Sequence, residues 1–273
     1  MSLIEARFEV LAQQGKKALI PYLVAGDPNL EITVPLMHSM VEAGADILEL
    51  GVPFSDPMAE GQVIALAHER ALLTGASLRK ALACVGEFRQ SDQHTPVLLM
   101  GYANPVFHMG YAEFADAAAA VKLDGLLTVD IPPEEVKELN LELNRVGIDN
   151  IFLVAPTTPD SRVGLITEQA SGFIYCVALK GVTGAGNLDP EYVAEQVKRI
   201  RSHTKLPVAV GFGIKDAKSA ASISTFADGV VVGSALVQTV ADVVDAGGSS
   251  QDAIDAAVTL VASIRRGIDA ATS

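Results

Sequence analysis

One glutamate occupies a position where charged residues are rare. Glu49 lies in the apolar run 46–51, in which the only other charge is the first residue, Asp46. An ionised carboxylate buried in such a run is destabilising unless it is paired or used, and burial raises its pKa. A raised pKa lets a carboxyl group give and take a proton near neutral pH. We therefore interpret Glu49 as a proton carrier; the alternative is a structural glutamate that is hydrogen-bonded inside the fold.

Two further acids follow in the loop after this run. Residues 53–61 place Asp56 and Glu60 between two prolines and a final glycine, just beyond the end of the apolar run. An acid/base reaction needs a second proton-transferring group opposite the first. Taken alone, each of these acids is more simply a solvated loop residue, so the sequence leaves their roles open.

Glycines at the ends of two later apolar runs indicate a phosphate site. Gly211-Phe212-Gly213 ends one run and Gly233-Ser234 ends the next. Backbone N–H groups bind phosphate in such turns, and glycine permits their close approach. The glycine-rich segment 180–187 would add another N–H and act as a lid. Simple turn geometry is the alternative, but two such turns favour a small phosphorylated substrate.

The remaining candidates carry a weaker signal. Tyr175 lies in an apolar run, where its hydroxyl has Glu49 as one plausible partner and simple packing as the equal alternative. The histidines show no metal-ligand spacing, so we expect surface or packing roles and no metal site. The sequence contains no P-loop, no GxGxxG after the first run and no GxSxG. The histidines are His38, His68, His94, His108 and His203.

Eight short apolar runs would position these residues. Most are continuous rather than alternating, as expected for parallel strands that are covered on both faces. Helical patterns separate them, and a small residue followed by Asp repeatedly leads into a run. Eight such units in 273 residues favour an α/β fold, a (β/α)8 TIM barrel over residues 1–273 as a single domain. We expect an extra N-terminal helix beneath the barrel and an extra helix in the loop after the second strand. The runs are 18–24, 46–51, 97–101, 125–129, 150–154, 172–177, 207–211 and 229–233.

Composition narrows the partners and the compartment. The formal charge of −13 argues against binding nucleic acid or an anionic membrane, because both require basic patches. The chain has two cysteines, Cys84 and Cys176, both in apolar surroundings, which predicts buried free thiols and a reducing cytoplasm. The charged N-terminal segment does not resemble a signal peptide, and no apolar run is long enough to span a membrane.

Several long motifs, in one order, resemble the family of tryptophan synthase alpha subunits over nearly the whole chain. The resemblance implies retro-aldol cleavage of indole-3-glycerol phosphate to indole and glyceraldehyde 3-phosphate, with no metal and no cofactor of the subunit's own. The motifs are Ala25-Gly26-Asp27-Pro28, Leu48-Glu49-Leu50-Gly51-Val52-Pro53-Phe54-Ser55-Asp56-Pro57, Met100-Gly101-Tyr102-Ala103-Asn104-Pro105, Val154-Ala155-Pro156-Thr157-Thr158-Pro159, Gly181-Val182-Thr183-Gly184-Ala185 and Val210-Gly211-Phe212-Gly213-Ile214.

The resemblance also implies individual roles. Glu49 would carry protons to and from the substrate, with Tyr175 beside it, and Glu60 would lie near the indole N–H. Thr183 would help to close the lid over Asp56 and Glu60. The indole would be walled by Phe212, Met100, Leu127 and Leu153, and the phosphate held by Gly184, Gly213, Gly233 and Ser234.

A partner follows from the same resemblance. The family docks on a beta subunit that carries pyridoxal phosphate, in an alpha2beta2 assembly, and passes indole to it through a tunnel. The loop 53–61 and the segment 104–107 would face that subunit. Met58, Val106 and Phe107 are compatible with an interface there.

A few residues depart from the family's usual pattern. Glu60 stands in place of Asp and adds a methylene, which changes its reach; a misplacement of about 1 Å can cost on the order of 100-fold in rate. Gln62 replaces a Pro, which makes the loop more mobile. Ala178 and Leu179 replace Ser and Arg before the lid. These changes bear on rate and lid closure, not on the class of reaction.

Two other functions stay open from the sequence. An isomerase acting on a phosphorylated sugar or aromatic would need another acid/base set, such as Lys or Cys at a strand end, and no strong candidate is present. A non-catalytic subunit that only activates a beta partner is kept open by Glu60 and Gln62. Glu49 and the phosphate loops argue against that second alternative.

Overall fold

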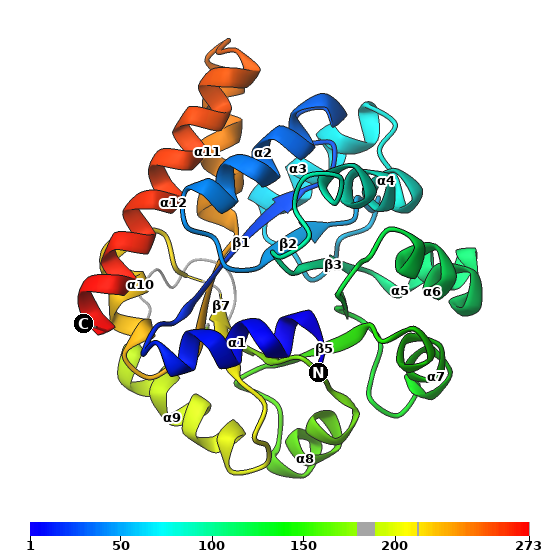
Figure 1. Cartoon of the computed structure of the whole chain (residues 1–273), viewed down its shortest axis with the longest axis vertical. Coiled ribbons are helices and arrows are strands. Elements are labelled where there is room, and N and C mark those ends of the chain that lie inside the picture. Colours follow the sequence, from blue (N-terminus) through cyan, green and yellow to red (C-terminus); the bar gives the residue numbers. More distant parts are fainter. Residues whose placement is uncertain (179–188, 212, 273) are drawn as a thin grey trace.

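The eight apolar runs form a closed barrel. The computed structural model describes residues 1–178, 189–211 and 213–272. Within them, parallel strands pair in chain order and the first also pairs with the last, which confirms the predicted (β/α)8 barrel (Figure 1). The strands are β1 Ala18–Val24, β2 Leu48–Gly51, β3 Val97–Gly101, β4 Gly125–Thr128, β5 Asp149–Val154, β6 Ile174–Val177, β7 Val208–Gly211 and β8 Gly229–Val232.

Helices surround the barrel, and both predicted extra helices are present. The N-terminal helix is α1, and the extra helix after β2 is α3. No helix in the described part of the chain combines the length and the apolarity needed to cross a membrane. The helices are α1 Leu3–Gln13, α2 Leu30–Glu42, α3 Gln62–Leu73, α4 Leu78–Phe88, α5 Ala103–Met109, α6 Tyr111–Ala120, α7 Lys137–Val146, α8 Asp160–Gln169, α9 Pro190–Arg201, α10 Ala217–Ser224, α11 Ser234–Asp245 and α12 Ser250–Thr272.

The first helix closes one end of the barrel. Ser2 begins α1 with a capping box in which Ser2 and Glu5 exchange side-chain and backbone hydrogen bonds. Ile4 and Phe8 are buried in the same apolar cluster as the inward-facing strand residues, and the Phe8 ring lies 5.6 Å from that of Phe173. A Cβ on Gly125 would lie 2.9 Å from Ile4, so the glycine makes room for the helix. Helix α1 is therefore the expected plug, and it crosses the barrel in Figure 1.

The repeated Asp before a strand has a structural role. Each of three such aspartates accepts a hydrogen bond from a backbone N–H at the start of the preceding strand, and so joins two strands at the closed end. Asp46 makes such a bond and precedes the strand instead of belonging to it, so β2 begins at Leu48 and not at Asp46. The bonds run from Leu19 N–H to Asp46 (2.9 Å), from Val97 N–H to Asp124 (2.7 Å) and from Val208 N–H to Asp228 (2.9 Å).

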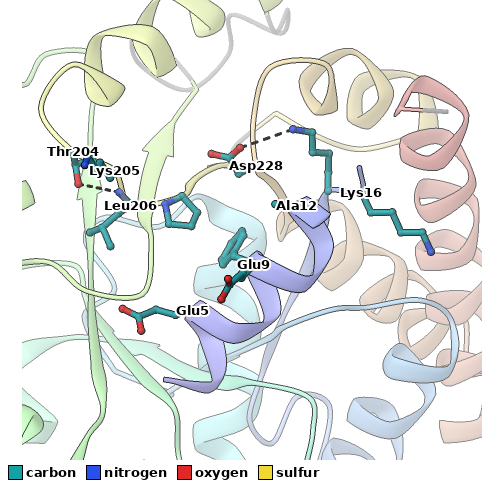
Figure 2. Close-up of a pocket in the computed structure, with 11 residues that line it drawn as sticks. Glu5, Glu9, Ala12, Lys16, Thr204, Lys205, Leu206 and Asp228 are labelled. Carbon is teal, nitrogen blue, oxygen red and sulfur yellow. Dashed lines mark hydrogen bonds and ion pairs between the residues drawn. The ribbon is translucent and has the colours of Figure 1, made fainter. Parts of the chain in front are cut away.

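A cavity of about 510 Å³ lies at this closed end, between α1 and the segments that enter β7 and β8 (Figure 2). Its charged residues have both signs, and Lys17 lies 3.9 Å from Asp228 across it. The hydroxyl of Thr204 accepts a hydrogen bond from Leu206 N–H at 3.1 Å. In barrels of this type, the N-terminal ends of the strands serve stability and the C-terminal ends carry the chemistry. We therefore place the candidate site at the other end.

Candidate active site

Glu49 lies inside the barrel on β2, in register with Tyr22 on β1 and with Leu98 on β3. Its exposed fraction is 1%, and neither carboxyl oxygen has a hydrogen-bond partner among the described residues. Burial raises its pKa to about 8, and the nearby charge of Glu60 adds to the rise. The group is therefore mostly protonated at neutral pH. The alternative of a hydrogen-bonded structural glutamate has no support in this arrangement.

The structure separates the two loop acids, which the residue pattern alone left unranked and of which the resemblance singled out Glu60. Glu60 is half-buried and faces the barrel mouth, where burial raises its pKa to about 7. Asp56 is exposed and accepts a 2.5 Å hydrogen bond from the hydroxyl of Ser55. Of the two loop acids, Glu60 is therefore the one whose charge acts on Glu49.

Side chains from two elements hold the loop 53–61 at both ends. Ala59 N–H donates to the Tyr102 hydroxyl at 3.0 Å, and the rings of Tyr102 and Phe54 stack with centroids 5.0 Å apart. Phe54 N–H donates to His68 Nδ1 at 3.1 Å, and His68 Nε2 lies 3.3 Å from the Tyr22 hydroxyl. Sequence reasoning assigned neither Tyr102 nor His68 to the site. The only signal for His68 was its place on the inward face of a helix that follows the loop.

Two tyrosine hydroxyls lie over glycines at strand ends. A Cβ on Gly51 would overlap the hydroxyl of Tyr22, and a Cβ on Gly211 would overlap that of Tyr175. The charge of Glu49 adds to the effect of burial in raising the pKa of both tyrosines, so both rings lie near the carboxyl group. Glu49 does not, however, hydrogen-bond to Tyr175. The glycines are needed at these two positions because the phenol groups occupy the space of a side chain.

A cavity of about 460 Å³ opens beside these groups at the barrel mouth. Glu60, Met100 and Leu153, which the sequence analysis expected around the substrate, line it. Leu127 is fully buried in the apolar cluster inside the barrel, together with Met100 and Ile151, and does not line this cavity. Sequence reasoning missed several apolar lining residues from the loop after β4 and from β6: Val129, Ile131, Pro132 and Val177.

The turns after β7 and β8 have the backbone features of an anion site. Gly213 has φ +78°, which other residues rarely adopt, and it is exposed. Gly233 precedes the twelve-residue helix α11, and no side chain among the described residues caps the N–H groups there. The unpaired N–H groups and the helix dipole of such an end attract phosphate. Ser234 is the exposed first residue of α11.

Some predicted residues lie outside the described part of the chain. These are Thr183, Gly184 and Phe212. Within residues 1–178, 189–211 and 213–272, no group of three or more His, Cys, Asp or Glu side chains is placed to hold a metal ion. The two cysteines are free and buried, as expected. The mouth thus brings together two carboxyl groups of raised pKa, Glu49 and Glu60.

Known proteins are similar to this chain in both sequence and fold. Residues 8–266 match the family described as tryptophan synthase alpha chain. Alpha chains from Nitrosococcus oceani and Thioalkalivibrio sulfidiphilus are 59% and 60% identical, over 88% and 89% of this chain and 89% and 91% of the relatives. The crystal structure of tryptophan synthase subunit alpha from Legionella pneumophila superposes with a TM-score of 0.91, at 42% identity over 99% of both chains.

Proposed function

Because the chain belongs to the tryptophan synthase alpha chain family, we propose that the mouth of the barrel is its active site, with Glu49 and Glu60 as the catalytic pair. The chain is a lyase of tryptophan biosynthesis that cleaves indole-3-glycerol phosphate to indole and glyceraldehyde 3-phosphate. The observation that carries the proposal is the buried Glu49 carboxyl group, which lacks a structural partner and lies near a second acid of raised pKa.

The pair can move every proton that the cleavage needs. Protonated Glu49 gives its proton to carbon 3 of the indole, and Glu60, ionised, accepts or shares the proton of the ring nitrogen. The carboxylate left on Glu49 then takes the proton of the glycerol hydroxyl as the bond between the indole and the glycerol carbon breaks. The new carbonyl leaves as glyceraldehyde 3-phosphate and indole regains its N–H. Glu49 ends protonated, so the cycle closes.

The cavity and the turns suit the two ends of the substrate. We place the indole against Met100 and Leu153, with Tyr175 beside Glu49; Leu127 supports the wall from beneath. The phosphate would accept hydrogen bonds from N–H groups near α11 and the turn after β7. The proposed phosphate residues are Gly213, Gly233, Ser234 and, outside the described residues, Gly184, with Thr183 in the lid and Phe212 against the ring.

The name of the family implies a beta subunit as partner. We propose an alpha2beta2 assembly in which the beta subunit carries pyridoxal phosphate and receives the indole, while this chain uses no cofactor. Support comes from two exposed apolar side chains near the mouth, Met58 in the loop 53–61 (86% exposed) and Phe107 in α5 (70% exposed). The docking surface would include that loop and the segment 104–107.

Two broader expectations accompany this function. We propose that residues 1–273 act as one catalytic domain, in keeping with a family match over residues 8–266. We also propose a cytoplasmic location, which suits the buried free thiols of Cys84 and Cys176.

The test is release of glyceraldehyde 3-phosphate from indole-3-glycerol phosphate, with and without a beta subunit. We expect cleavage that rises when the beta subunit is added and is lost in Glu49→Gln. Glu195→Gln, an exposed carboxyl group on α9, is the matched control and should retain cleavage. A Glu49→Gln chain that cleaves normally would refute the catalytic pair. No cleavage by the unaltered chain, with beta activity still enhanced, would instead favour the regulatory subunit.

A further inference from the structure

The geometry fixes the protonation of a buried histidine beside the active site. His68 is 2% exposed, and Phe54 N–H donates to its Nδ1 at 3.1 Å. A backbone N–H can only donate, so Nδ1 must be the unprotonated nitrogen. The single ring proton then lies on Nε2, which donates to the Tyr22 hydroxyl at 3.3 Å. Burial lowers the pKa of His68 to about 4, which keeps the ring in this neutral form.

The two hydrogen bonds link the strand side of the site to the loop side. Phe54 belongs to the loop 53–61, whose far end carries Glu60. Tyr22 lies on β1 as the register partner of Glu49. His68 therefore touches the loop that carries Glu60 and the strand β1, which pairs with β2 at Glu49.

The hydroxyl of Tyr22 is oriented by the same interaction. Tyr22 has one hydroxyl proton, and because its oxygen accepts from His68, that proton remains to be donated elsewhere. The oxygen lies where a Cβ of Gly51 would stand, two residues beyond Glu49 on β2. Burial raises the pKa of this tyrosine, and the charges of Glu60 and Glu49 raise it further. Its hydroxyl therefore lies close to both carboxyl groups.

Packing alone does not require an imidazole at this position. The other buried residues of α3 are Ile64, Ala67 and Ala71, and all are apolar. A polar ring in such surroundings is costly unless its nitrogens are hydrogen-bonded, and an apolar side chain would avoid that cost. In His68 both nitrogens are used, each on a different element.

We propose that His68 is a positioning residue, which holds Phe54 N–H and the Tyr22 hydroxyl and thereby fixes Glu60 relative to Glu49. This inference rests on the proposed roles of those two glutamates. His68 acts through the loop and Tyr22, and not on the substrate. A shift of about 1 Å in a reacting group can cost on the order of 100-fold in rate. Loss of the His68 hydrogen bonds should therefore lower mainly kcat.

Three substitutions at one position separate the two hydrogen bonds. His68→Leu removes both. His68→Asn places an amide oxygen near the site of Nδ1 and restores the bond to Phe54, whereas His68→Gln reaches the site of Nε2 and restores only the bond to Tyr22. Phe88→Leu, in the buried outer core on α4, is the control for lost stability without contact with the site.

The readouts are kcat and KM for indole-3-glycerol phosphate, and hydrogen exchange of the Phe54 amide. We expect His68→Leu to lower kcat by ten- to a hundredfold with KM changed less than about threefold, and to speed exchange at Phe54. His68→Asn should recover most of kcat and of the slow exchange, and His68→Gln less of both. Phe88→Leu should lower the melting temperature comparably and leave kcat within about twofold.

Contrary results are equally clear. The proposal is overturned if His68→Leu matches Phe88→Leu in kcat, or if His68→Asn recovers no more activity than His68→Gln. It is also overturned if exchange at Phe54 is unchanged in His68→Leu. Because exchange is measured without turnover, a failure of the catalytic roles of Glu49 and Glu60 would appear separately, as cleavage retained in Glu49→Gln.

Discussion

The hydroxyl of Tyr102 accepts a 3.0 Å hydrogen bond from the backbone N–H of Ala59, the residue immediately before Glu60. Tyr102 follows β3 directly, so this bond ties the loop after β2 to the neighbouring strand of the barrel. Burial raises the pKa of Tyr102 to about 12, and the phenol therefore stays neutral throughout the physiological range. The carboxyl group of Glu60, the second of the proposed catalytic pair, is thus attached to the barrel through the residue next to it.

Removing this hydroxyl should slow the reaction. Tyr102→Phe keeps the ring stacked on Phe54 but leaves Ala59 N–H without its partner, and a hydrogen bond of this kind contributes about 1 kcal/mol. We expect kcat to fall about fivefold, with a smaller change in KM. Steady-state kinetics measure this, and Tyr111→Phe on α6, outside the cavity at the mouth, is the control. An unchanged kcat in Tyr102→Phe would mean that the bond does not position Glu60.

The protonation of Glu49 should make stability depend on pH. Its pKa is raised from 4.5 to about 8 on folding, so the folded chain holds a proton that the unfolded chain releases. Stability should therefore fall as pH rises from about 4.5 to about 8, by at most about 1.4 kcal/mol per pH unit. Glu49→Gln should lose this dependence. Urea unfolding at pH 5, 6, 7 and 8 measures it, and parallel curves for the two proteins would contradict the buried carboxyl group.

Activity should show a maximum between two titrations. The proposed mechanism needs Glu60 ionised and Glu49 protonated, and their pKa values are about 7 and about 8. We expect kcat/KM to rise through pH 7 and to fall above pH 8, with apparent values that belong to the pair. In Glu60→Gln the acidic limb should disappear from the residual activity. A rate that continues to rise above pH 8.5 would contradict the role of protonated Glu49.

Adding a methyl group at Gly213, in the proposed phosphate turn, should weaken substrate binding. Gly213 has φ +78°, where a side chain costs about 1–2 kcal/mol. We expect Gly213→Ala to raise KM for indole-3-glycerol phosphate about tenfold, because a displaced N–H binds phosphate poorly.

Gly147 provides a matched control for that strain. It has φ +75° at the end of α7, and a Cβ there meets no other atom. Gly147→Ala should lose similar stability in thermal unfolding and leave KM unchanged. If the two variants raise KM equally, the effect comes from global destabilisation and not from the phosphate site.

Local patterns in the sequence determined the barrel and pointed to Glu49, the first residue of the proposed catalytic pair. Continuous apolar runs can be satisfied only by strands that are covered on both faces, so all eight strands could be placed within two residues of their observed bounds. Glu49 stood out because a buried carboxylate in such a run is destabilising unless it is paired or used. The glycines after β7 and β8 stood out because backbone approach requires glycine. Each of these inferences depends on a residue and its immediate neighbours.

Only the tertiary structure decided how the loops meet. The residue pattern of the loop alone did not rank Asp56 against Glu60, and only the resemblance to a family singled out Glu60. In the structure, with Phe54 stacked on Tyr102 and Ala59 N–H bonded to the Tyr102 hydroxyl, Glu60 faces the mouth and Asp56 is exposed. From the sequence alone, His68 is expected to be a surface or packing residue. Its role depends on hydrogen bonds to Phe54 and Tyr22, which belong to other elements. Hydrogen bonds and desolvation are set by neighbours that are distant in sequence, and closure of the barrel brings those neighbours together.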